Sequence, residues 1–190
     1  MQAPDYYGYE PVVTLRRPLV LTGHPGGDLR EAAYDLAALT GLAVHDLDHR
    51  IAHEVGQSTW QLRCEQGVEA YLHRASSLAP SLLDSAPAGL IVIAAGVLEA
   101  DGQLATLIGA RAELVFLRVE LAAIYWYLRG TKGADPTCVA VGPIYPKHPD
   151  DLAPLLAASL TIQAAADLVL DVVPGQVHAT VSVLQSEIAA

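Results

Sequence analysis

The chain has 190 residues, of which 52% are hydrophobic and 17% charged; this composition is typical of a globular domain and excludes a disordered chain. It contains neither an uncharged apolar run of about 18 residues nor a secretory signal pattern, so no membrane insertion is expected. The two cysteines, Cys64 and Cys138, are too few for a disulfide framework, and the chain is expected to be cytoplasmic. The net charge of −10 disfavours nucleic-acid binding, because phosphate backbones require clustered Lys and Arg.

The first fifteen residues are rich in tyrosine and have no helical period. Tyr6, Tyr7 and Tyr9 lie there beside proline and glycine. The segment is either a loose extension or a strip that docks on a neighbouring protein. We predict a flexible N-terminal extension over residues 1–15, followed by one α/β domain over residues 16–190.

Short apolar runs then alternate with amphipathic segments. Strands are expected at 18–22, 42–46, 89–95, 113–118 and 167–172. Helices are expected at about 28–40, 47–55, 58–84, 102–111, 119–129, 149–163 and 175–188. Most strand candidates are almost continuously apolar, which is typical of strands buried on both faces. The alternation predicts a three-layer α/β/α domain with a five-stranded parallel sheet.

Several local signals mark the ends of these elements. Ser58 and Gln61 have the spacing of a capping box, Gly41 follows one helix, and Pro174 precedes another. Residues 130–148 have no clear period and are predicted to form a mobile loop or lid. His24, Glu99 and Asp101 lie near predicted loops and are expected to face solvent rather than to act in catalysis.

The turn after the first strand has the position and length of a P-loop, which has the pattern G-x-x-x-x-G-K-[ST]. In a P-loop the backbone N–H groups surround phosphates, the lysine contacts the β/γ oxygens, and the hydroxyl binds Mg²⁺. Here Leu29 and Arg30 replace the lysine and the hydroxyl, and Asp28 replaces the last glycine. Asp28 would cap the following helix and repel a phosphate.

Two interpretations of this turn stay open. One is a tight glycine turn capped by Asp28, and the other is a residual anion site assisted by Arg30. No nucleotide cofactor is expected on the first interpretation. The residues of this degenerate P-loop are Gly23, Gly26, Gly27, Asp28 and Arg30.

The order of several stretches resembles shikimate kinase, a P-loop kinase of the nucleoside-monophosphate-kinase type. "LAVHDLDHRI" is similar to the family's second strand and its Asp-x-Asp, here Asp46 and Asp48. "VGQSTWQLRCEQGVEAYLHR" is similar to the helical substrate-binding segment, and "LIVIAAGV" to the third strand with its triple glycine. The resemblance covers about residues 17–188. It implies a shikimate-kinase-like fold with strand order 2-3-1-4-5.

The family's functional residues mostly have no counterpart here. The resemblance places Leu72 at the arginine that holds the shikimate carboxylate, and Gln163 near a second substrate arginine. Residues 131–148 contain no lid arginine, and Lys132 is the cation that could reach the site. Because phosphoryl transfer depends on positioning and electrostatic stabilisation, these losses predict a protein that is not an enzyme. The expected function is that of a pseudokinase acting as a protein-binding adaptor, scaffold or regulatory subunit, with no catalytic residues.

A second cluster lies in "HDLDHRIAH". His49 and His53 are four residues apart and share a helix face, and with Asp46 and Asp48 they offer ligands that suit Zn²⁺. The other interpretation is a solvated polar helix face, and no metal is expected. The alternative function is therefore a small-molecule or metal-binding enzyme or sensor that reuses the old cleft. A third is an intact kinase with Arg30 and Lys132 in the cationic roles.

Tyr125, Trp126 and Tyr127 are consecutive on one predicted helix, so at least one must lie off its core-facing side. Exposed Trp and Tyr are enriched at protein interfaces, although a lid that folds back would also cover them. We predict a protein partner or self-association as a homodimer. The predicted interface residues are Tyr6, Tyr7, Tyr9, Tyr125, Trp126 and Tyr127.

Overall fold

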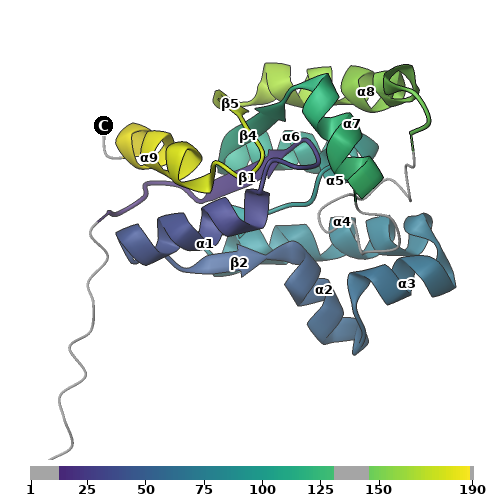
Figure 1. Ribbon diagram of the computed structural model, residues 1–190. Coiled ribbons are helices and arrows are strands. Elements are labelled where there is room, and N and C mark those ends of the chain that lie inside the picture. The colour runs from purple at the N-terminus through teal and green to yellow at the C-terminus, as the bar shows by residue number, and fades with distance from the viewer. Residues whose placement is uncertain (1–12, 131–145, 189–190) are drawn as a thin grey trace, which may run out of the picture.

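The computed structural model describes residues 13–130 and 146–188 (Figure 1). Within these ranges the strands are β1 (Leu19–Gly23), β2 (Val44–Asp46), β3 (Leu90–Val92), β4 (Glu113–Val119) and β5 (Leu168–Val172). They form one parallel sheet in the order β2-β3-β1-β4-β5. The predicted fold class, strand number and strand order are therefore confirmed.

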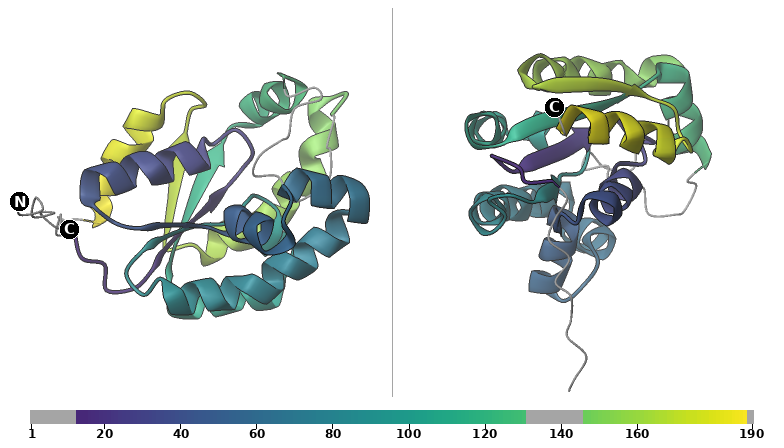
Figure 2. Two further views of the ribbon diagram at one scale, coloured as in Figure 1. Left: turned by 90° about the horizontal axis from the view of Figure 1, so that it is seen from below. Right: turned by 90° about the vertical axis from the view of Figure 1, so that its left-hand side faces the viewer.

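The helices cover both faces of this sheet. They are α1 (Leu29–Thr40), α2 (Leu47–Val55), α3 (Thr59–Gln66), α4 (Val68–Ser85), α5 (Val97–Ala100), α6 (Gly102–Arg111), α7 (Leu121–Gly130), α8 (Ala153–Ala165) and α9 (Val177–Ile188), with a 3₁₀ turn, η1 (Pro149–Leu152). Figure 2 shows α1 and α9 together on one side of the strands. No helix in the described ranges is both long and apolar enough to cross a membrane.

The central strands β3, β1 and β4 are largely buried on both faces and divide the core into two clusters. Leu21 of β1 packs with Leu36 of α1 and Leu184 of α9 in the first cluster. Phe116 of β4 packs with Ile108 of α6 in the second, which also contains the buried faces of α2, α3 and α4. The packed central strands therefore fix the position of their carboxyl ends, where α/β sheets bind ligands.

The predicted helix over 58–84 is wrong in one respect, since it is two helices that meet at Gly67. Gly67 has φ 87° and ψ 167°, a backbone conformation open almost only to glycine, and the helix cannot continue through it. The capping box is confirmed, with Gln61 N–H donating to Ser58 Oγ at 3.1 Å and Ser58 N–H donating to Gln61 Oε1 at 3.2 Å. The short helix α5 was not predicted.

Parts of the sequence-based predictions lie outside the described residues. These are Tyr6, Tyr7 and Tyr9, Lys132, and all of the predicted lid except its two ends. Of the predicted N-terminal extension, the described residues Val13 and Leu15 pack against the first core cluster.

Candidate functional site

The loop between β1 and α1, at the P-loop position, is buried along its length. Every residue from Gly23 to Gly27 is buried. A Cβ added to Gly23 would lie 2.3 Å from the carbonyl oxygen of Leu117, and one added to Gly26 would lie 3.0 Å from Cγ of Tyr127. Gly26 also has φ 82°. These glycines allow β4 and α7 to approach the loop closely, as the tight-turn interpretation requires.

His24, within this loop, is buried, so its predicted exposure to solvent is wrong. Its Nδ1 lies 3.2 Å from the backbone nitrogen of Val119, and its Nε2 lies 2.9 Å from Ser159 Oγ. Its ring meets the edge of Phe116, with ring centroids 5.0 Å apart. Gln163 donates to the same Ser159 hydroxyl at 2.9 Å. Burial lowers the pKa of His24, so the imidazole is neutral and links β1, β4 and α8.

Asp28 occupies the N-cap position of α1, but its predicted capping hydrogen bonds are absent. Its backbone is left-handed, with φ 47°, whereas capping residues are normally extended. The carboxylate instead accepts a hydrogen bond from the backbone N–H of Gly175, in the loop between β5 and α9. The negative charge at this position is therefore used to join two loops at the carboxyl edge of the sheet.

Glu99 is another residue whose predicted exposure is wrong. Its carboxylate accepts a hydrogen bond of 2.9 Å from the backbone N–H of Gly96, which has φ 89°. Burial raises the pKa of the Glu99 carboxyl. Asp101 is partly exposed and caps α6, accepting hydrogen bonds of 3.0 Å from the N–H groups of Gln103 and Leu104. Both carboxylates shape the turn after β3.

Arg30 of α1 reaches the Asp-x-Asp that follows β2. Its Nε forms an ion pair with Asp46 Oδ2, and its Nη2 lies 3.5 Å from Asp48 Oδ2. The exposed fraction of the Arg30 side chain is 28%, whereas those of the two aspartates are 4% and 9%. A guanidinium group therefore lies beside two nearly buried carboxylates and neutralises part of their charge.

Asp46 has a clear structural role. It is the N-cap of α2, and its Oδ1 accepts hydrogen bonds from the backbone N–H groups of Asp48 at 2.9 Å and His49 at 3.3 Å. Its other carboxylate oxygen is engaged by Arg30. Both oxygens are thus occupied by partners within the protein.

Asp48 has a more unusual environment. Its Oδ1 accepts a hydrogen bond of 2.6 Å from the hydroxyl of Tyr71, which is fully buried on α4. Burial raises the pKa of Asp48, and the Asp46 charge acts in the same direction. The Tyr71 hydrogen bond and the positive charges of Arg30 and Arg63 oppose this rise. Buried carboxyl groups with a raised pKa are candidate acid–base groups when they line a cleft.

Arg63 is a second cation near Asp48, and sequence reasoning missed it. Its guanidinium carbon lies 5.2 Å from the ring centroid of Tyr71 and 5.9 Å from that of Trp60. Both distances are within the range of cation–π contacts. The i, i+3 spacing of Trp60 and Arg63 on a predicted helix could have suggested this pairing, but the contact with Tyr71 depends on how α3 packs against α4.

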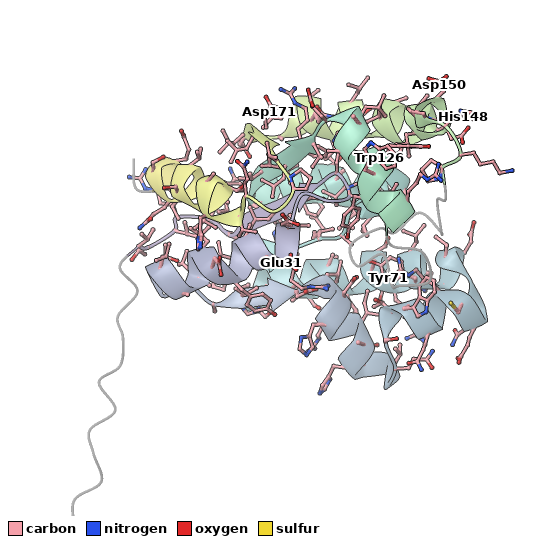
Figure 3. All side chains as sticks on the ribbon, viewed as in Figure 1. Glu31, Tyr71, Trp126, His148, Asp150 and Asp171 are labelled. Carbon is pink, nitrogen blue, oxygen red and sulfur yellow. The ribbon has the colours of Figure 1, made fainter. Side chains whose placement is uncertain are left out.

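Asp48 lines a cavity of about 250 Å³, which we call the Asp48 cleft. Arg30, Asp46, Asp48, Ser58 and Thr59 are among its lining residues. Figure 3 shows Tyr71 on α4, in the region where α2, α3 and α4 come together. The cleft therefore combines carboxylate acceptors, a guanidinium group and hydroxyl groups, a set that suits a small polar ligand.

The predicted histidine–aspartate cluster does not gather around one point. Asp46 and Asp48 are brought together, but His49 and His53 are exposed. Across residues 13–130 and 146–188, no three His, Cys, Asp or Glu side chains are placed to hold a metal ion. The two aspartates are instead bridged by the guanidinium of Arg30.

The aromatic run on α7 is divided among three environments. Tyr125 is buried, and its hydroxyl donates to the carbonyl oxygen of Lys147 at 2.9 Å while it accepts from Arg129 at 2.8 Å. Tyr127 packs against Gly26. Trp126 is 68% exposed and stands on α7 in Figure 3. At least one aromatic therefore lies off the core, as predicted, while the interface itself stays a prediction.

Solved structures provide the comparison for this fold. Shikimate kinase from Acinetobacter baumannii in complex with shikimate matches with a TM-score of 0.76 and 16% identity, covering 91% of this chain and 93% of that chain. The chain has the fold of a shikimate kinase. The enzyme from Bacteroides thetaiotaomicron matches with a TM-score of 0.72 and 18% identity over 92% and 99% of the two chains. The enzyme from Aquifex aeolicus gives 0.67 and 16% over 90% and 98%.

No protein-family model and no curated protein matches the sequence. The TM-scores of 0.67–0.76 establish the shikimate-kinase-like fold, and the identities of 16–18% leave the reaction open.

The prediction that the chain is not an enzyme is contradicted by these comparisons, because the three structures named above are shikimate kinases, which are phosphotransferases. That prediction counted the cations missing from motif positions. It gave Arg30 a role only in a residual anion site or an intact kinase and missed Arg63, whereas the fold brings both cations close to Asp48.

Proposed function

We propose that this protein is a small-molecule-binding enzyme or sensor, and that its ligand carries hydroxyl groups and occupies the Asp48 cleft. The observation that carries the proposal is the environment of Asp48. This carboxylate lines a cavity while it is held by the Tyr71 hydroxyl and faces the guanidinium of Arg30. A carboxylate fixed in this way accepts a hydrogen bond from a ligand hydroxyl, and its raised pKa suits it to take up the proton.

Arg30 defines the second part of the proposal. Its guanidinium lies beside both carboxylates, where it supplies positive charge without a divalent cation. We therefore expect ligand binding in the Asp48 cleft to be independent of Mg²⁺. The loop after β1 supports the same view, because it is buried and its Asp28 carboxylate is already bonded to Gly175. Weak binding of ATP with Mg²⁺ is the corresponding expectation for that loop.

Shikimate, the molecule bound in the Acinetobacter structure, is the first ligand to test. Calorimetric titration, with and without Mg²⁺, should give saturable binding of shikimate or of another cyclic hydroxy acid. Asp48→Asn should weaken binding at least about tenfold, or about 1.4 kcal/mol. Asp150→Asn, at an exposed position on η1, is the matched control and should bind normally. Equal binding by both variants, or no binding of any hydroxylated probe, would contradict the proposal.

A second candidate function is supported by Trp126. This side chain is 68% exposed, which is unusual for tryptophan and typical of an interface anchor. We propose that α7 binds a protein partner or a second copy of the chain, and this role is compatible with ligand binding in the Asp48 cleft. Light scattering at several concentrations, with Trp126→Ala as the variant and Leu160→Ala as an exposed apolar control, tests this association. The cytoplasmic location predicted from the sequence stays part of this proposal.

A further inference from the structure

A larger cavity of about 370 Å³ lies on the outer side of the edge strand β2, between α1, α2 and the end of α4. Its lining is rich in basic groups, namely His45 of β2 and His49, Arg50 and His53 of α2. Ser81 and Ser85 of α4 add hydroxyl groups. This concentration of basic side chains stands out in a chain with a net charge of −10. A volume near 370 Å³ falls in the range of small-molecule sites.

The basic groups of this cavity are not engaged by the protein. In the described part of the chain, neither the guanidinium of Arg50 nor the imidazoles of His45, His49 and His53 form a hydrogen bond or an ion pair. The ring of His45 packs closely against the backbone of Gly89, since a Cβ added to Gly89 would lie 3.0 Å from Cδ2 of the ring. The donors of the cavity are therefore available to a ligand.

The acidic groups nearby already have partners. Asp46, which also lines the cavity, is bonded to Arg30 and to two backbone N–H groups. Glu54 of α2 lies 3.6 Å from the guanidinium of Arg74, and Asp84 of α4 is ion-paired with Arg111. The uncompensated charge at the cavity wall is thus the positive charge of Arg50.

We propose that this cavity binds a small organic anion that carries two or more phosphate or carboxylate groups. Arg50 and the imidazole N–H groups contact the charged groups of the ligand. Tyr34, which is 47% exposed at the same cavity, packs against the body of the ligand. The site is separate in chemistry from the Asp48 cleft, although the two share Tyr34, Asp46 and His49 as lining residues. The inference does not depend on the proposed function of that cleft.

Calorimetric titrations with pyrophosphate and with citrate, at constant ionic strength, test the proposal. Saturable binding of one anion per chain is expected, and the tighter probe identifies phosphate or carboxylate as the preferred group. Arg50→Gln combined with His53→Gln should weaken binding at least about tenfold.

The matched control is Arg16→Gln combined with His73→Gln, which removes the same residue types from exposed positions outside the cavity lining. It should bind the anion normally, and thermal melting should show both double variants folded. Asp48→Asn should also retain anion binding, which separates this site from the cleft. The absence of saturable binding by both probes, or an equal loss in the two double variants, would overturn the proposal.

Discussion

Arg30 of α1 and Asp46 at the end of β2 form an ion pair that joins the first helix to the edge strand of the sheet. Asp46 at the same time caps α2 through two backbone N–H groups. One carboxylate therefore positions three elements around the Asp48 cleft. The pair is largely shielded from water, since the Asp46 side chain is 4% exposed.

We predict that Arg30→Met destabilises the protein by about 1.5–3 kcal/mol, because it leaves a nearly buried carboxylate without its charged hydrogen-bond partner. Arg30→Lys keeps the charge and should recover part of the loss, although it cannot repeat the guanidinium geometry. Urea unfolding of the three proteins measures the effect. An unchanged midpoint for Arg30→Met would show that water compensates the two aspartates.

The pH dependence of stability should reveal Asp48. Burial raises its pKa in the folded protein, so the folded state holds this proton more tightly than the unfolded chain does. The stability from this group is fully present below the unfolded pKa of about 3.9, and it is lost as pH rises through the folded pKa. Asp48→Asn cannot titrate. The free energy of unfolding of Asp48→Asn should therefore increase relative to that of wild type as pH rises from about 4 towards neutrality.

Asp150→Asn, at an exposed position on η1, is the control for this measurement. A difference between wild type and Asp48→Asn that stays constant over the same range would contradict the raised pKa of Asp48.

His24 should have the opposite effect, a loss of stability as pH falls. Its pKa is lowered in the folded protein, mainly by burial, so its contribution to stability is complete above the unfolded pKa of about 6.5. Below that pH the unfolded chain gains a proton that the folded protein does not. The free energy of unfolding therefore decreases as pH falls towards the pKa of His24 in the folded protein. His24→Gln should remove this part of the acid sensitivity in denaturant titrations. His178→Gln, at a fully exposed side chain, should keep it.

Gly26→Ala should destabilise the fold by at least about 1 kcal/mol, because alanine is strained at φ 82° and its Cβ would press on Tyr127. Gly109→Ala is the matched control. Gly109 lies within α6 and an added Cβ meets no atom within 4 Å, so alanine there should stabilise the helix by about 0.5–1 kcal/mol. Thermal unfolding compares the two, and similar effects at both glycines would argue against the close contact with Tyr127.

The fold could be predicted from local patterns because the strands are short apolar runs and the helices have caps that the sequence displays. The strand at 18–22 lies within one residue of β1, and the helix at 102–111 matches α6. The site was predicted less well. Asp46 and Asp48 were found through the Asp-x-Asp spacing, whereas the cation–π contacts of Arg63 and the burial of His24 depend on tertiary packing that no local period records.

Asp28 illustrates the same limit. Its residue type predicts a helix cap, but its partner, Gly175, is 147 positions away. A distant backbone donor of this kind has no signature in the residues around Asp28. The glycine pattern predicted a turn between the first strand and the first helix, whereas the contact of the Asp28 carboxylate with the loop before α9 is seen only in the structure.

The bond between Asp28 and Gly175 also bears on how the protein is made. Ribosomes release the N-terminal part of a chain first, and N-terminal segments begin to fold during synthesis. The turn after β1 emerges early, yet its partner belongs to a segment that emerges last, together with the helix α9 that packs on α1. The left-handed turn at Asp28 therefore reaches its final form only near the end of translation. Nascent chains truncated before residue 175 should leave this turn accessible to proteases.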